Sequence, residues 1–141
     1  MSTEENKALL QRFYDEVFNQ GNLEVADELI AADAVEHEAF PGLEGNGPEV
    51  AKQFVAIIRS AFPDIRVHTQ DMIAEADKVV ARITLTGTHR GEFLGIPPTG
   101  KQIEVGTMDI VRVADGKMVE HWGVTDNLTM MQQLGVVPIP G

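Results

Sequence analysis

The chain has 141 residues, and this length predicts one domain with a single hydrophobic core. Lys and Arg number 11 against 22 Asp and Glu, and the resulting formal net charge of −11 argues against binding to nucleic acid or anionic membranes. The lack of cysteine excludes disulfides, thiol nucleophiles and cysteine-ligated metals. Without a signal-like N-terminus or a long apolar run, a cytoplasmic protein is expected.

Apolar residues at three- and four-residue steps predict three helices in the first half of the chain. They are expected over residues 2–21, 23–32 and 48–62. Asn22 is a suitable N-cap for the second helix, and Pro63 is expected to end the third. A short extended segment is expected over residues 34–40.

The second half of the chain changes to β-rich runs that predict four strands. They are expected over residues 65–75, 79–89, 102–113 and 118–124. Tight turns between them favour antiparallel neighbours, and a last helix is expected over residues 126–134, capped by Thr125 and closed by Gly135. These elements predict an α+β fold, in which a curved antiparallel sheet wraps around three N-terminal helices to form a cone with an apolar pocket. Residues 1–141 would form this single domain.

Two carboxylates and one imidazole are candidates for proton transfer. Asp126 stands where the last strand passes to the last helix, where it can shuttle protons or simply favour the helix dipole. A three-residue turn at residues 114–116 would place Asp109 opposite His121, whereas a two-residue turn would place it opposite Trp122. An Asp–His pair can carry protons or form a structural ion pair.

Three other side chains are candidates for contact with a ligand. Trp122 suits a core, a dimer interface or a pocket wall, and Tyr14 suits the core or a hydroxyl presented to a pocket. Strand alternation points His37 away from its acidic neighbours, which leaves structural and ligand-binding interpretations open. The histidines show no metal-ligand spacing on one element, so no metal is expected.

Several stretches of the chain resemble the SnoaL-like polyketide cyclases, also called ester cyclases. The strongest likeness lies in residues 87–101 and 115–122, followed by Asp126, Leu128 and residues 133–135. Further support comes from residues 13–14, 18–22, 35–37 and 41–42, so the likeness spans nearly the whole chain. The resemblance implies the cone fold of the nuclear-transport-factor-two-like superfamily, in agreement with the predicted architecture.

The resemblance also implies an enzyme that closes a ring by intramolecular aldol addition, without metal, Schiff base or cofactor. In that family one Asp near the start of the last helix acts as general acid/base, and Asp126 matches its position. Asp126 would then remove an α-proton from a hydrophobic polyketide methyl ester, with His37 beside the substrate. A second group must polarise the carbonyl, and His121, held by Asp109, is the candidate.

Two other functions are compatible with the sequence, because one fold can serve many chemistries. An epoxide-hydrolase-like enzyme would need paired carboxylates and an arginine around one water. Asp109 and Asp126 would supply the carboxylates, and Arg82 or Arg112 the cation. A non-catalytic module that binds small molecules is the second alternative, and a fully exposed Asp126 would favour it.

The expected partners are a hydrophobic small molecule and a second copy of the chain. The outer face of the predicted sheet carries residues such as Met108 and Ile110, which would remain uncovered in a monomer. A homodimer through this face is therefore expected.

Overall fold

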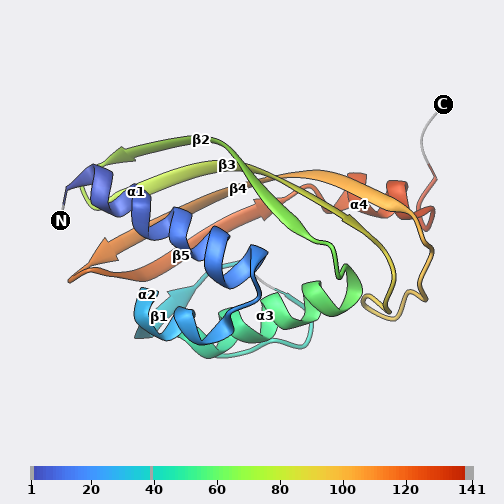
Figure 1. Cartoon of the computed structure of the whole chain (residues 1–141), viewed down its shortest axis with the longest axis horizontal. Coiled ribbons are helices and arrows are strands. Elements are labelled where there is room, and N and C mark those ends of the chain that lie inside the picture. Colours follow the sequence, from blue (N-terminus) through green and yellow to red (C-terminus); the bar gives the residue numbers. More distant parts are fainter. Residues whose placement is uncertain (1, 39, 139–141) are drawn as a thin grey trace.

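The computed structural model describes residues 2–38 and 40–138, and a five-stranded sheet with the order β1-β5-β4-β3-β2 forms its centre (Figure 1). The strands are β1 (Ile30–Glu36), β2 (Arg66–Glu75), β3 (Lys78–Thr88), β4 (Gln102–Ala114) and β5 (Lys117–Thr125). Neighbours from β2 to β5 are antiparallel, as predicted, whereas β1 lies parallel to β5 at one edge. This parallel edge strand is a correction to the all-antiparallel sheet that was expected.

Helices cover one face of the long strands, and the α+β architecture is confirmed (Figure 1). They are α1 (Thr3–Arg12), the π-helical segment η1 (Phe13–Asn19), the short 3-10 turn η2 (Leu23–Val25), α2 (Ala26–Leu29), α3 (Pro48–Ala61) and α4 (Asn127–Leu134). Ser2 and Glu5 form a capping box that starts α1. Within the described residues, no helix is both long and apolar enough to cross a membrane.

The second predicted helix is shorter than expected, because the chain turns into a strand at Ile30. Residues 30–32 fit a helical pattern of apolar side chains, but Ile30 has an extended backbone with φ −118° and ψ 131°. Its backbone pairs with Met118 of β5 instead. Tertiary pairing therefore overrides a local helical preference and creates β1.

The start of α4 is also corrected by the structure. Thr125 belongs to β5, and Asp126 is the N-cap, with its side chain accepting a hydrogen bond of 3.1 Å from the Thr129 backbone. The helix ends at Gly135 in the left-handed conformation, as predicted.

The hairpin between β4 and β5 has a two-residue turn. Asp115 and Gly116 both have positive φ, 51° and 75°, while Ala114 pairs with Lys117. Two consecutive positive φ angles are typical of a type I′ turn, which matches the twist of the flanking strands.

A β-bulge close to this turn shifts the register of the two strands. Asp109 therefore lies opposite Gly123, and Trp122 lies opposite Ile110. Both predicted registers, with Asp109 opposite His121 or opposite Trp122, are wrong for this reason. The bulge could not be located from the turn sequence, because it lies inside the strands rather than in the turn.

Every second side chain of β3 and β4 points toward the helices, and these side chains form much of the core. The buried residues of these strands include Val79, Ala81, Ile83, Leu85, Val105 and Val111. At the end of η1, the Asn19 side chain accepts a hydrogen bond of 2.7 Å from the Val67 backbone N–H and donates one of 3.2 Å to its carbonyl. Asn19 thus pairs with β2 as a strand residue would, and it joins the helical layer to the sheet.

Replacing Asn19 by alanine is expected to lower the free energy of unfolding by about 1–3 kcal/mol, because both backbone groups of Val67 lose their partners. Urea denaturation followed by the fluorescence of the single Trp residue, Trp122, measures this change. Asn22→Ala is the matched control, since Asn22 makes no side-chain capping bond. Equal losses in the two variants would contradict the assigned role of Asn19.

Candidate active site

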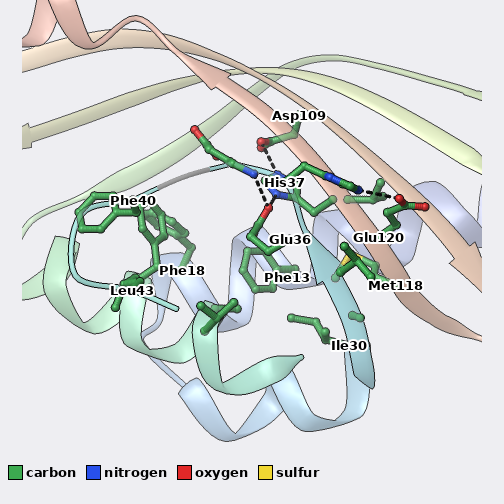
Figure 2. A pocket seen from close by; sticks show the side chains of 18 of the residues that line it. Phe13, Phe18, Ile30, Glu36, His37, Phe40, Leu43, Asp109, Met118 and Glu120 are labelled. Atoms are coloured by element: carbon green, nitrogen blue, oxygen red, sulfur yellow. Dashed lines mark hydrogen bonds and ion pairs between the residues drawn. The ribbon is translucent and has the colours of Figure 1, made fainter. Parts of the chain in front are cut away.

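A cavity of about 430 Å³ opens between the helices and the sheet. Apolar side chains form most of its wall, and Figure 2 shows Phe13, Phe18 and Phe40 on one side with Asp109 at its upper end. Glu36, on β1, lies between these two regions (Figure 2). The predicted apolar pocket is therefore present, and its polar groups are concentrated at one end.

His121 lies at the centre of the polar end, between two carboxylates. Its Nε2 is 2.8 Å from Asp109 Oδ1, and its Nδ1 bonds to Glu36 Oε2. Carboxylates only accept hydrogen bonds, so an imidazolium that donates from both nitrogens fits this arrangement. Burial opposes the charged imidazole, but the two carboxylates outweigh it and raise the pKa of His121 to about 10.

Tyr14 approaches the same cluster from the helical layer. Its hydroxyl donates a hydrogen bond of 2.6 Å to Asp109 Oδ2, and its ring is buried. Burial and the Asp109 charge raise the pKa of Tyr14 well above its ordinary value, so the hydroxyl keeps its proton. Asp109, which is only 7% exposed, therefore accepts hydrogen bonds at both of its oxygens.

Glu38 is a second carboxyl beside Asp109. The Thr125 hydroxyl donates a bond of 3.2 Å to Glu38 Oε2, and Glu38 lines the cavity. Burial is the main cause that raises the pKa of Glu38, and the nearby charge of Asp109 adds to it, while His121 opposes it. Two carboxyl groups with different surroundings thus face the same space.

Glu38, Asp109 and His121 each offer one ligand atom, and these atoms lie within 4.8 Å of one another. This spacing would suit a metal ion. Both nitrogens of His121 are already hydrogen-bonded to carboxylates, however, and a ligand nitrogen must have a free lone pair. Hydrogen bonds within the protein account for these positions, because Asp109 bonds to His121 and Glu38 bonds to Thr125.

His37 follows β1 directly and lines the cavity, as Glu36 and Glu38 do, and its side chain is 40% exposed. Its Nε2 is 2.6 Å from Glu120 Oε2, and Figure 2 shows this pair. The ring of Trp122 stacks on the His37 ring at 4.9 Å between centroids and does not line the cavity. Trp122 instead lies on the outer face of the sheet, with the Lys78 amino group 5.7 Å from its ring centroid.

Asp126 lies outside the cavity. Its carboxylate is exposed and bonds to the backbone N–H and the hydroxyl of Thr129. The hydroxyl bond and then the backbone bond lower the pKa of Asp126. This is the geometry of a helix cap, and its two hydrogen bonds outweigh the effect of desolvation, so the pKa of Asp126 does not move toward neutral pH.

Neither arginine of the epoxide-hydrolase alternative lines the cavity. Arg82 pairs with Asp71 on the outer side of the sheet, and Arg112 pairs with Glu120. The set of two carboxylates and one arginine around a water is therefore not assembled.

Three groups of this site were not identified from the sequence: Glu36, Glu38 and Gly123. The two glutamates were treated only as neighbours of His37, although a spacing of two residues in an extended segment places them on one face. That signal pointed to a pair of carboxylates. No sequence signal indicated Gly123, whose importance depends on the strand register.

Comparison with known proteins gives a family match over residues 8–134, to a model described as SnoaL-like polyketide cyclase. Nogalonic acid methyl ester cyclase of Streptomyces nogalater is 28% identical over 84% of this chain and 89% of its own length. Aklanonic acid methyl ester cyclase DnrD of Streptomyces peucetius is 29% identical over 85% of this chain and 84% of its own length.

Solved structures show the same fold. TsrD of Streptomyces laurentii matches with a TM-score of 0.88 and 28% identity over 97% of this chain and 99% of TsrD. IdmH of Streptomyces antibioticus, a proposed polyketide cyclase, matches with a TM-score of 0.79 and 38% identity over 93% of this chain and 99% of IdmH. The expected family and cone fold are confirmed, and the relatives named as cyclases support the expectation of an enzyme. The chain belongs to the SnoaL-like polyketide cyclase family.

Proposed function

We propose that this protein is a cofactor-independent cyclase that closes a ring in a polyketide ester by intramolecular aldol addition, with Asp109 as the base. One observation carries the proposal: a buried carboxylate, Asp109, stands at the polar end of an apolar cavity and is held by Tyr14 and His121. A base of this kind can remove a proton from a carbon next to a carbonyl.

The two partners of Asp109 have distinct roles in this proposal. Each carboxylate oxygen has two lone pairs, so Asp109 can bond to Tyr14 and His121 and still accept a substrate proton. The imidazolium of His121 keeps positive charge beside the place where the enolate forms, which lowers the cost of that negative charge. His37, which lines the cavity with a partly exposed side chain, is proposed to contact the substrate.

The choice of Asp109 over Asp126 follows from their surroundings. A polyketide in the cavity would contact Asp109, which is buried there, while Asp126 caps α4 in solvent. If Asp126 were the only candidate base, its exposure would favour a non-catalytic binding module. The buried network around Asp109 gives the cavity the acid/base group that such a module would not need.

A homodimer through the outer face of the sheet is also part of the proposal. Cross-strand pairing places apolar residues in one row across four strands, and these are Ile73, Val80, Ile110 and Trp122. Met108 and Val124 pair beside this row and are 46% and 74% exposed. Such a contiguous apolar face is stabilised when a second copy covers it.

Asp109→Asn is expected to lower kcat by about 100-fold or more, because the amide cannot accept the α-proton. Aklanonic acid methyl ester and nogalonic acid methyl ester, the substrates named for the relatives, are the test compounds. Ring closure gives an isomer of unchanged mass, which chromatography with mass detection separates from the substrate. Asp126→Asn is expected to keep activity near that of the wild type. Loss of activity in Asp126→Asn with retention in Asp109→Asn would reverse the assignment.

Stability is expected to fall as the pH rises from about 6.5 to about 10, where His121 loses its proton. The folded state binds this proton more tightly than the unfolded state does. Protonated His121 therefore gives its full stabilisation below the ordinary pKa of histidine, and this stabilisation is lost as the pH rises through the raised pKa of the folded state. The slope from this group is at most about 1.4 kcal/mol per pH unit. Urea denaturation across this pH range measures it. His121→Asn should reduce the dependence of the free energy of unfolding on pH, whereas His68→Asn, at an exposed position, should not. Equal slopes in the wild type and both variants would contradict a protonated His121 in the folded state.

Light scattering after gel filtration is expected to give the wild type a mass about twice the 15.4 kDa of the chain. Val124→Glu should give a monomer, because it places a charge in the proposed interface. Leu128→Glu is the control, since Leu128 is similarly exposed but lies on α4. A monomeric wild type would rule out the proposed dimer.

A further inference from the structure

Gly123 leaves open the space in which two carboxyl groups approach each other. A Cβ atom built at this position would lie 2.5 Å from Glu38 Oε1 and 2.8 Å from Asp109 Oδ1. Both distances are shorter than real Cβ contacts, so any larger residue would displace a carboxyl group. Glycine is needed here for close approach, and its φ angle is not in the left-handed region.

Glu38 is oriented toward this space by one hydrogen bond. The Thr125 hydroxyl bonds to Oε2, and Thr107 in turn bonds to the Thr125 hydroxyl at 3.3 Å. Among the residues that the structure describes, Glu38 Oε1 has no hydrogen-bond partner, and it is the atom that approaches Gly123. One oxygen of Glu38 is thus fixed, while the other faces Asp109 and the cavity.

The charges around Glu38 favour its protonated form. Glu36 and Asp109 each bond to His121, which is a single cation, and Tyr14 contributes no charge. Glu38 is the third carboxyl around this cation and does not bond to it. Like charges at this distance do not all ionise readily, and burial together with Asp109 raises the pKa of Glu38.

An aldol addition needs an acid as well as a base, because the attacked carbonyl oxygen becomes an alkoxide. His121 has both nitrogens engaged with carboxylates. Tyr14 directs its proton to Asp109, and its raised pKa makes it a poor proton donor. Glu38 lines the cavity close to Asp109 and, unlike Glu36, does not bond to His121, so it is the acid best placed for this step.

We propose that Glu38 is a second catalytic carboxyl, which gives a proton to the substrate oxygen and recovers it from Asp109 across the space above Gly123. This role rests on the proposed cyclase function and supplies its proton donor. The two carboxyls offer oxygens within 4.8 Å of each other, so the proton returns over a short path.

The step balances without a further reactant. Asp109 takes the α-proton, and the resulting enolate carbon forms a carbon–carbon bond with a second carbonyl carbon of the same molecule. The electron pair of that carbonyl moves to its oxygen, which takes the proton of Glu38 and becomes a hydroxyl. Asp109 then passes its proton to Glu38. The product is an isomer of the substrate, and both carboxyls return to their starting states.

The first test is independent of substrate. Protein labelled at the δ-carboxyl carbon of glutamate is titrated by NMR, and the Glu38 signal is identified by its loss in Glu38→Gln. We expect its midpoint above the ordinary glutamate value of about 4.3, and lower in Asp109→Asn because a neighbouring charge is removed. Asp33→Asn, an exposed position of β1, should leave the Glu38 midpoint unchanged. A Glu38 midpoint at the ordinary value would overturn the proposal.

The second test follows the cyclisation of aklanonic acid methyl ester. Glu38→Gln is expected to lower kcat by about 100-fold with little change in KM, and Asp33→Asn should match the wild type. The acid acts only while protonated, so wild-type kcat should fall as the pH rises through the Glu38 midpoint measured by NMR, and Glu38→Gln should lack that fall. Gly123→Ala is a second variant that should lower kcat by displacing a carboxyl; circular dichroism checks its fold.

The outcomes separate this role from the cyclase function. An active wild type with unchanged kcat in Glu38→Gln overturns the role of Glu38 and leaves the cyclase function standing. A wild type that cyclises neither methyl ester overturns both. Loss of kcat in Glu38→Gln together with a raised Glu38 midpoint supports the proposal.

Discussion

The site depends on one interaction, the bridge that His121 makes between Glu36 and Asp109. These residues come from β1, β4 and β5, so the bridge joins the edge strand to the centre of the sheet. A buried imidazole that gains two carboxylates keeps its proton, and the cation in turn offsets the repulsion between them. Removing His121 would leave Glu36 and Asp109 without the cation that offsets their repulsion.

The bridge requires an exact register of β4 and β5. The bulge near the hairpin turn moves Asp109 opposite Gly123, and His121 then reaches it along a diagonal of the same face. With the unshifted register, a side chain would occupy the place of Gly123. The carboxyl group of Glu38 has space beside Asp109 because the shifted register places a glycine, Gly123, at this position.

The cavity combines apolar walls with this charged end, and the combination suits a large, mostly apolar substrate with reactive carbonyl groups. The aromatic side chains of the helical layer make this wall apolar, and an apolar surrounding strengthens the electrostatic interactions at the polar end. Tyr14 connects the two regions, because its ring packs in the core while its hydroxyl reaches Asp109. The helical layer thus contributes directly to the chemistry of the sheet.

Local sequence determined most of the elements of this protein. Periodicity and turn residues located α1, α3 and strands β2 to β5 within a few residues, because these elements follow from the spacing of side chains and from Pro and Gly. The sequence also paired Asp109 with His121, although by a register that was wrong. Tertiary structure alone decided the parallel pairing of β1, the bulge, and with them the positions of Glu36, Glu38 and Gly123. The physical reason is that the site is built from contacts between segments that lie far apart in the chain. Asp126, in contrast, matched the family pattern by its position in the sequence, and a local helix cap holds its side chain in solvent.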